Sequence, residues 1–247
     1  MKKLKVLDLF SGIGGFSLGL EKTGGFETVA FCEKEKYPQS VLAKHWKEVP
    51  IYEDVKTLTA SRIAQDGIEV DVITGGFPCQ DISCTGLQRG LGKNTRSGLW
   101  SECARLIREI HPRYAIFENV TALLTGNGGK WFEQVLWEIS KVGYDAEWHC
   151  IPASQLGANH HRDRVWIVAY PNRARCEVRS LPLGILAQHA NLSGPSWWQV
   201  EPSVDRVSNG IPSQAHRLKA LGNSVVPQIP EIIGNAILAA SAETDYV

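Results

Sequence analysis

Short apolar runs alternate with helical stripes along most of the chain, and this alternation constrains the fold more than any other feature. We expect strands at residues 4–9, 26–32, 70–74, 114–117, 145–151 and 165–170. Helices are expected at residues 16–21, 38–46, 99–110, 131–139 and 230–240, mostly from apolar residues at helical spacing. Strands that alternate with helices predict an α/β fold, with a mostly parallel sheet and helices on both faces.

A glycine-rich turn follows the first apolar run. The turn reads SGIGG at residues 11–15, and such glycines let the backbone approach a ligand and open a helix N-terminus. Glu33 ends the second run, where an acidic side chain can accept hydrogen bonds from a ribose diol. Together these features indicate a cofactor that contains adenosine. A purely structural tight turn is the alternative.

Further reactive side chains follow the later strands. Cys79 comes just after a core strand and behind Pro78, which suits a nucleophile, although a cysteine alone is more often a packed thiol. Glu118 ends another strand, and Arg162 and Arg164 alternate at the entry to the last one. Ligands of parallel sheets bind beyond the carboxyl ends of the strands, so these side chains are expected at one edge.

The charge of the chain is unevenly distributed. Its net charge is zero, but residues 160–219 hold eight basic residues against four acidic ones. This pattern fits a phosphate-facing surface and equally a solvated basic face. No C-x-x-C pair, signal-peptide core or run of 18 apolar residues occurs. We therefore expect reduced cysteines, no membrane span and a cytoplasmic location.

Residues 171–216 interrupt the periodic pattern. They contain five prolines and little periodicity, which predicts a small, irregular insert. Arg173, Arg175 and Arg179 in this segment are candidate phosphate contacts, with solvated surface charge as the alternative.

Six motifs together resemble one enzyme family. In chain order they read DLFSGIGG, FCE, GGFPCQ, ENV, HRDRVW and LGNSVVPQI, and they frame almost the whole chain. This order closely resembles the C5-type DNA cytosine methyltransferases, in particular compact, phage-like members. The resemblance implies a Rossmann-like fold that binds S-adenosylmethionine (SAM), with a catalytic domain at 1–170. It also implies a target-recognition segment at 171–216 and a C-terminal return to the catalytic domain at 217–247.

The resemblance implies a role for each matching residue. Cys79 corresponds to the nucleophile that adds to C6 of cytosine, and Glu118 to the group that engages N3 and the exocyclic amine. Arg162 and Arg164 correspond to two arginines near the target base and its phosphate. The positions that match SAM contacts are Phe10, Gly12, Gly14, Glu33, Asp54, Leu99 and Asn223, of which Asp54 would face the adenine amine.

The chain departs from the family pattern at three places. His160 stands where the family usually has glutamine, and Lys34 stands where a large apolar residue often covers the adenine. The recognition segment is also short. A short segment offers few contacts to base edges, which favours a short or relaxed DNA site.

Other functions are compatible with part of this pattern. An RNA (tRNA) cytosine-5 methyltransferase would share the catalytic motifs, and a non-catalytic DNA-binding relative would share the fold. A generic dinucleotide-dependent enzyme explains only the glycine turn. For the methyltransferase we expect double-stranded DNA as partner, monomeric action and association with the nucleoid through DNA. A restriction endonuclease partner is left open.

Overall fold

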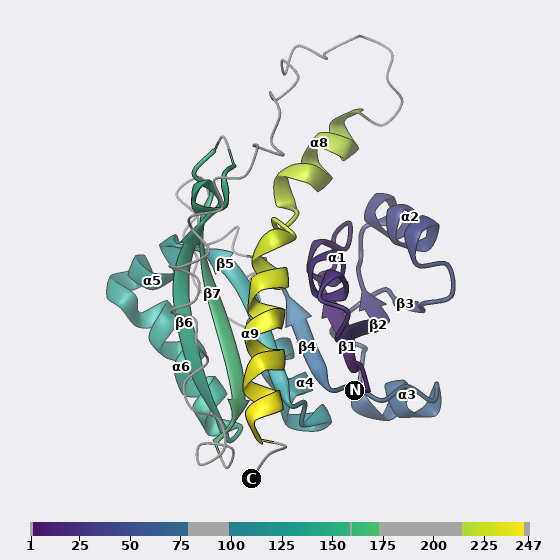
Figure 1. The fold of residues 1–247 in the computed structure, drawn as a ribbon, viewed down its shortest axis with the longest axis horizontal. Coiled ribbons are helices and arrows are strands. Elements are labelled where there is room, and N and C mark those ends of the chain that lie inside the picture. The colour runs from purple at the N-terminus through teal and green to yellow at the C-terminus, as the bar shows by residue number, and fades with distance from the viewer. Residues whose placement is uncertain (1, 79–98, 159, 173–213, 245–247) are drawn as a thin grey trace.

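The computed structural model describes residues 2–78, 99–158, 160–172 and 214–244, and is built on a seven-stranded sheet (Figure 1). The strand order is β3-β2-β1-β4-β5-β7-β6. The first five strands of this order are parallel, whereas β7 runs antiparallel to both β5 and β6. The strands are β1 (Leu4–Leu9), β2 (Phe26–Cys32), β3 (Ile51–Tyr52), β4 (Val72–Gly75), β5 (Tyr114–Val120), β6 (Tyr144–Pro152) and β7 (Asp163–Pro171). The predicted mostly parallel sheet is confirmed.

Helices cover both faces of the sheet. In Figure 1, α9 crosses the front of the sheet and α4 lies behind it. The α-helices are α1 (Gly15–Lys22), α2 (Lys36–His45), α3 (Ala60–Gln65), α4 (Trp100–Ile110), α5 (Ala122–Thr125), α6 (Lys130–Lys141), α8 (Gln214–Asn223) and α9 (Gln228–Thr244). Two short 3-10 helices are η2 (Gly126–Gly129) and η3 (Ala153–Leu156). Within the described residues, no helix combines the length and apolarity needed to cross a membrane.

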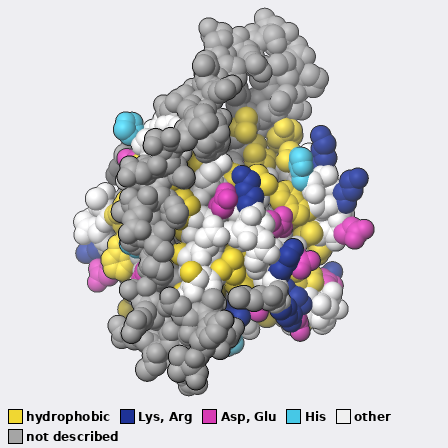
Figure 2. Space-filling model, in the orientation of Figure 1, with side chains coloured by type: hydrophobic (Ala, Val, Ile, Leu, Met, Phe, Trp, Pro, Cys, Tyr) yellow, Lys and Arg dark blue, Asp and Glu magenta, His cyan; other side chains and the backbone are white. Residues whose placement is uncertain are grey.

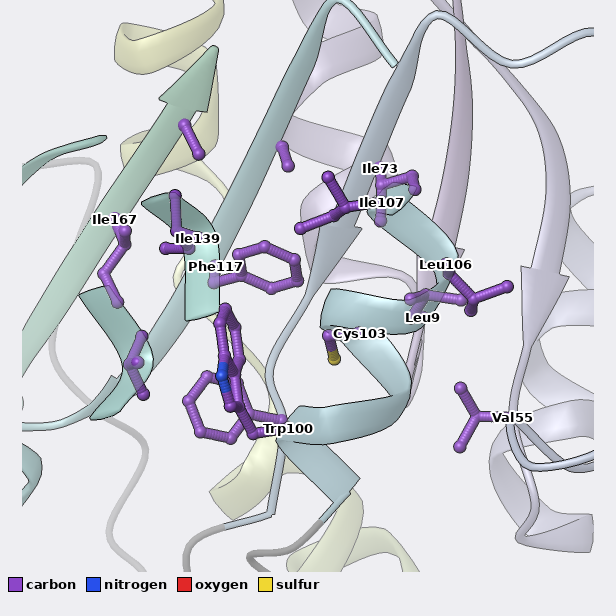
Figure 3. Close-up of a cluster of buried hydrophobic side chains, with 14 of the residues drawn as sticks. Leu9, Val55, Ile73, Trp100, Cys103, Leu106, Ile107, Phe117, Ile139 and Ile167 are labelled. Atoms are coloured by element: carbon purple, nitrogen blue, oxygen red, sulfur yellow. The ribbon is translucent and has the colours of Figure 1, made fainter. Parts of the chain in front are cut away.

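One apolar core lies between the sheet and α3, α4 and α6. Side chains alternate between the faces of a strand, so Leu9, Ile73 and Phe117 point to this side. They meet the apolar stripe of α4, where Trp100 and Leu106 are fully buried (Figure 3). The helical spacing of residues 99–110 therefore predicted both the helix and its buried face.

The second core lies on the opposite face, beneath α1 and α9. Val6, Val72 and Ile116 from three neighbouring strands are buried there, against Phe16 of α1 and Ile233 of α9. The C-terminal helix thus packs on the first helix of the chain. The first and last parts of the sequence share one core.

Most of the elements that the sequence pattern did not predict are short, and α8 (ten residues) is the exception. β3 has two residues and α3 has six, too few for a periodic pattern to emerge. A local cap stabilises the start of α3, because Oγ1 of Thr59 accepts a hydrogen bond from the backbone N–H of Arg62 at 3.2 Å. In addition, α8 begins at Gln214, two residues before the expected end of the irregular segment.

Candidate active site

The glycine turn joins β1 to α1 through residues in the left-handed region of backbone space. Phe10 has φ of 51°, Gly12 of 54° and Gly14 of 85°. Hydrogen bonds within the turn hold this shape. The hydroxyl of Ser11 donates to the carbonyl of Asp8 at 2.5 Å, and the N–H of Gly14 donates to the carbonyl of Ser11 at 2.8 Å. The turn is therefore preformed at the carboxyl end of β1.

Glu33 links this turn to the end of β2. Its Oε2 accepts a hydrogen bond from the backbone N–H of Gly12 at 2.8 Å, and its Oε1 accepts one from the N–H of Glu35 at 2.7 Å. Burial raises the pKa of Glu33, and these backbone donors partly offset the shift. Each carboxylate oxygen keeps further acceptor capacity, so the fixed carboxylate can still receive hydroxyl donors.

Asp54, after β3, is paired with Lys34 at the same edge of the sheet. The Nζ of Lys34 lies 3.2 Å from Oδ2 of Asp54. The pKa of Asp54 is lowered, with the hydrogen bond from the N–H of Lys56 and the Lys34 ammonium both favouring the charged form. Lys34, which stands where the family often has a large apolar residue, therefore touches the predicted cofactor contact Asp54.

Asp8 is a buried carboxyl group that the sequence analysis did not assign to the site. It is completely buried on β1, and the hydroxyls of Ser17 in α1 and Thr74 in β4 donate to its two oxygens at 2.8 and 2.9 Å. Burial raises the pKa of Asp8 to about 7, with the two hydroxyls acting in the opposite direction. A charged residue inside an apolar strand was the signal for this position.

The segment that leads to Cys79 runs beside β5. The Nδ2 of Asn119 donates to the carbonyl of Phe77 at 3.1 Å. A Cβ on Gly76 would lie 3.4 Å from Oε2 of Glu118, so the backbone passes close to this carboxyl group. Cys79 itself lies outside the described residues.

Glu118 is a buried carboxyl group with an arginine beside it. The Nε of Arg164 lies 2.9 Å from Oε1 of Glu118, an ion-pair contact that lacks the alignment of a hydrogen bond. Burial raises the pKa of Glu118, while the positive charges of Arg164 and Arg162 act against the shift. The antiparallel pairing of β5 with β7 produces this contact. It aligns Arg164 with Val120, which lies two residues after Glu118 and on the same face of β5.

Arg162 has different partners. Its two terminal nitrogens donate to the backbone carbonyls of Gly222 at 2.8 Å and Ser224 at 2.7 Å. Burial lowers the pKa of Arg162, and the charge of Arg164 lowers it further. Asn223, between the two carbonyls, is exposed at the end of α8.

The predicted site residues follow the expected arrangement in part. Phe10, Glu33, Gly76 and Glu118 all follow or end parallel strands at one edge of the sheet. Contacts join Gly12 with Glu33 and Glu118 with Arg164. Leu99, by contrast, precedes α4 and packs at the border of the apolar core.

Comparison with known proteins identifies the family. The model of the C-5 cytosine-specific DNA methylase family matches residues 4–197. The chain belongs to this family. The family resemblance predicted from the six motifs is therefore confirmed.

Methyltransferases of this family are similar to the chain at about 30% identity. Type II methyltransferase M.Sau3AI of Staphylococcus aureus is 33% identical over 183 residues, which cover 69% of this chain and 44% of the relative. M.HaeII of Haemophilus aegyptius is 31% identical, over 78% of this chain and 58% of the relative. The orphan methyltransferase M.Rho11sI of Bacillus phage rho11s is 32% identical, over 68% of this chain and 33% of the relative. The chain thus spans about half the length of the curated relatives it matches.

Solved structures share the fold. A protein encoded within an E. coli prophage, described as a DNA modification methyltransferase, aligns with a TM-score of 0.60 at 25% identity. The alignment covers 73% of this chain and 49% of that protein. Spodoptera frugiperda DNMT2 aligns with a TM-score of 0.55 at 24% identity, over 69% of this chain and 50% of that one. The predicted methyltransferase fold is confirmed, and the roles of individual site residues stay predictions.

The described surface shows no single-sign patch on the face drawn in Figure 2. Basic and acidic side chains are interspersed along its right-hand side. Lys34, Lys36 and Lys219 each pair with an acidic partner. The candidate phosphate contacts Arg173, Arg175 and Arg179 lie outside the described residues.

Proposed function

We propose that this chain transfers a methyl group from SAM to C5 of cytosine in DNA, through a covalent bond between Cys79 and a flipped-out base. The observation that carries the proposal is the buried Glu118, with Arg164 at 2.9 Å and the backbone that leads to Cys79 beside it. A buried carboxyl group with a raised pKa suits a proton donor to the ring nitrogen of the base.

The residues at and around the glycine turn suit the binding of SAM. Glu33 offers oriented acceptor oxygens for a ribose diol, and the left-handed turn at Phe10, Gly12 and Gly14 opens the N-terminus of α1. Asp54 would face the adenine amine, and Leu99 and Asn223 complete the set. Bound SAM would supply an electrophilic methyl group.

The protein would activate the base by covalent addition. The Cys79 thiolate forms a bond to C6, and the electrons of the C5–C6 double bond shift into the ring and charge N3. Glu118 donates its proton to N3, so the intermediate is a neutral enamine whose C5 is nucleophilic. Arg164 holds the Glu118 carboxyl group in place and stabilises the carboxylate that remains.

The last steps restore the enzyme. After C5 is methylated, loss of the C5 proton returns an electron pair to the ring. The bond between C6 and the sulfur of Cys79 breaks, and N3 returns its proton to Glu118. The net change replaces one hydrogen of cytosine with a methyl group and releases one proton.

The partners follow from the substrate. A base inside a duplex is out of reach, so flipping it costs roughly a few kcal/mol, which contacts from residues 171–216 would offset. Several relatives are named Type II methyltransferases, which supports a restriction endonuclease as a functional partner. We also propose monomeric action in the cytoplasm, at the nucleoid.

A map of 5-methylcytosine tests the function. The chain and its Cys79→Ala variant are expressed in a host that lacks cytosine methylation, and modified positions are mapped genome-wide. We expect methylation in one short sequence context for the parent chain and none for the variant. Methylation that persists in the variant would refute the covalent mechanism.

An assay on purified nucleic acids distinguishes a DNA substrate from an RNA substrate. Equal amounts of duplex DNA and transfer RNA are incubated with the purified chain and radiolabelled SAM. Label in the RNA alone would decide for an RNA cytosine-5 methyltransferase. Label in neither, from a folded chain that binds SAM, would favour a non-catalytic relative.

A further inference from the structure

The two arginines at the start of β7 contact different parts of the molecule, although only one residue separates them. Arg164 contacts the buried Glu118. Arg162, in contrast, donates to the carbonyls of Gly222 and Ser224, which lie 60 and 62 residues later in the chain. Charge-assisted hydrogen bonds of this kind are stronger than neutral ones, and the guanidinium uses both of its terminal nitrogens. Arg162 therefore binds the backbone carbonyls on both sides of Asn223.

The opposite side of the same segment rests on the glycines of α1. A Cβ on Gly15 would lie 2.8 Å from the carbonyl oxygen of Val225, and a Cβ on Gly19 would lie 2.1 Å from the carbonyl oxygen of Pro227. No larger residue fits at these two positions without a shift of the backbone. Residues 222–227 are thus held between the glycine face of α1 and the guanidinium of Arg162.

The helix before this segment touches the cofactor side of the site. Lys219 of α8 forms an ion pair with Glu35 at 2.5 Å, and Glu35 donates its backbone N–H to the carboxylate of Glu33. The ring of His216 stacks on Tyr37 with centroids 6.0 Å apart. The position of residues 222–224 therefore sets where α8 and Asn223 lie relative to Glu33.

We infer that Arg162 is a positioning residue, which holds Asn223 and the end of α8 at the rim of the cofactor site, while Arg164 acts on the base side through its contact with Glu118. This inference rests on the proposed function. It divides the two arginines by role, although both belong to one motif. Loss of Arg162 should weaken cofactor binding, and loss of Arg164 should slow methyl transfer to the base.

The test compares Arg162→Lys with Arg164→Lys, and uses Arg113→Lys as a matched control at the opposite end of the sheet. Lysine keeps the charge but cannot donate to two carbonyls from a fixed fork. The probe is S-adenosylhomocysteine, whose affinity is measured by calorimetry. We expect Arg162→Lys to weaken its binding by about tenfold, with Arg164→Lys and Arg113→Lys within about twofold of the parent.

Duplex DNA binding gives the complementary measurement. Arg162→Lys should keep the DNA affinity of the parent within about threefold. Arg164→Lys should lower the turnover number of methyl transfer while the cofactor affinity stays that of the parent. An Arg162→Lys variant that binds the cofactor normally but loses DNA affinity or turnover would overturn the inference.

Amide hydrogen exchange tests the inference without an activity assay, and it can also be measured on a variant that folds less stably. In Arg162→Lys, the amides of residues 222–226 should exchange faster, while those of β1, β4 and β5 exchange as in the parent. Uniformly faster exchange, or no change in exchange, would refute the positioning role of Arg162. If the parent chain methylates nothing yet this local change occurs, the proposed function fails and the positioning role of Arg162 stands.

Discussion

The two sides of the active site are built by different means. On the cofactor side, Glu33 is held by the backbone N–H groups of Gly12 and Glu35, all within residues 12–35. On the base side, the buried Glu118 meets Arg164 across the antiparallel strands β5 and β7. Local backbone contacts thus hold the acid of the cofactor side, and a long-range side-chain contact holds the acid of the base side. Substitutions should therefore affect the two sides separately.

The largest effect is expected on the base side, from Glu118→Gln. Glutamine keeps the size of the side chain but cannot donate a proton to N3, so the turnover number should fall by about 10²–10⁴. Single-turnover methylation of duplex DNA measures the loss. Glu133→Gln, an exposed substitution on α6, is the control and should leave the rate unchanged. A fall in the affinity for S-adenosylhomocysteine in Glu118→Gln would contradict the separation of the two sides.

The corresponding test of the cofactor side is Glu33→Ala. It removes the oriented acceptor oxygens and leaves the N–H of Gly12 unpaired, so binding of S-adenosylhomocysteine should weaken by about 10- to 100-fold. Calorimetry measures this affinity, and Glu33→Gln, which retains one acceptor oxygen, should fall between the variant and the parent. DNA affinity in the absence of cofactor should not change. A variant that loses DNA binding instead would show that the two sides are coupled.

Asp8 connects both sides, because its partners Ser17 and Thr74 lie in α1 and β4. Its pKa of about 7 exceeds the usual value for aspartate, so the folded protein retains a proton that the unfolded chain loses. The contribution of this group to stability is therefore complete at low pH and declines as pH rises toward 7, by at most about 1.4 kcal/mol per pH unit.

Asp8→Asn removes this titration while it keeps an acceptor and a donor for the two hydroxyls. Relative to the parent, its free energy of unfolding should increase as pH rises from 4 to 7 and then level off. Urea unfolding at several pH values measures the difference. Asp8→Ala should instead be destabilised at every pH, because it leaves both hydroxyls unpaired. A flat difference between Asp8→Asn and the parent would place the pKa of Asp8 in the ordinary range.

The smallest effect concerns Lys34. Its exposed ion pair with Asp54 occupies a carboxylate that we assign to the adenine amine. Exposed pairs are worth about 0–1 kcal/mol, so Lys34→Met should tighten S-adenosylhomocysteine binding by no more than about fivefold. Lys36→Met, which removes the neighbouring pair with Glu53, is the control and should leave the affinity unchanged. Weaker binding in Lys34→Met would mean that this lysine contacts the cofactor directly.

The sequence predicted most of the long elements, α8 excepted, and the shared edge of the sheet, because both have a periodic or positional signal. The stripe from Leu99 to Ile110 and the polar ends of the parallel strands are examples. The two-residue strand β3 and the six-residue helix α3 had no such signal. They depend on neighbouring elements and on a single cap at Thr59.

The contacts of individual site residues were harder to predict. Arg162 binds backbone carbonyls, and every residue has one, so no residue type marks its partners. Lys34 and Asp54 become neighbours only through the parallel pairing of β2 and β3. The resemblance placed both arginines near the base, whereas their partners differ in the folded chain.

The contact between Gly19 and Pro227 also constrains how the protein is made. During synthesis, α1 emerges from the ribosome some 200 residues before the segment that covers it. At 5–20 residues per second, its apolar face would wait about 10 to 40 s for that cover. Phe16 and Leu20 share their core with residues of α9, so part of their surface would stay uncovered during this interval, and we expect newly made chains to benefit from chaperones or from rapid translation.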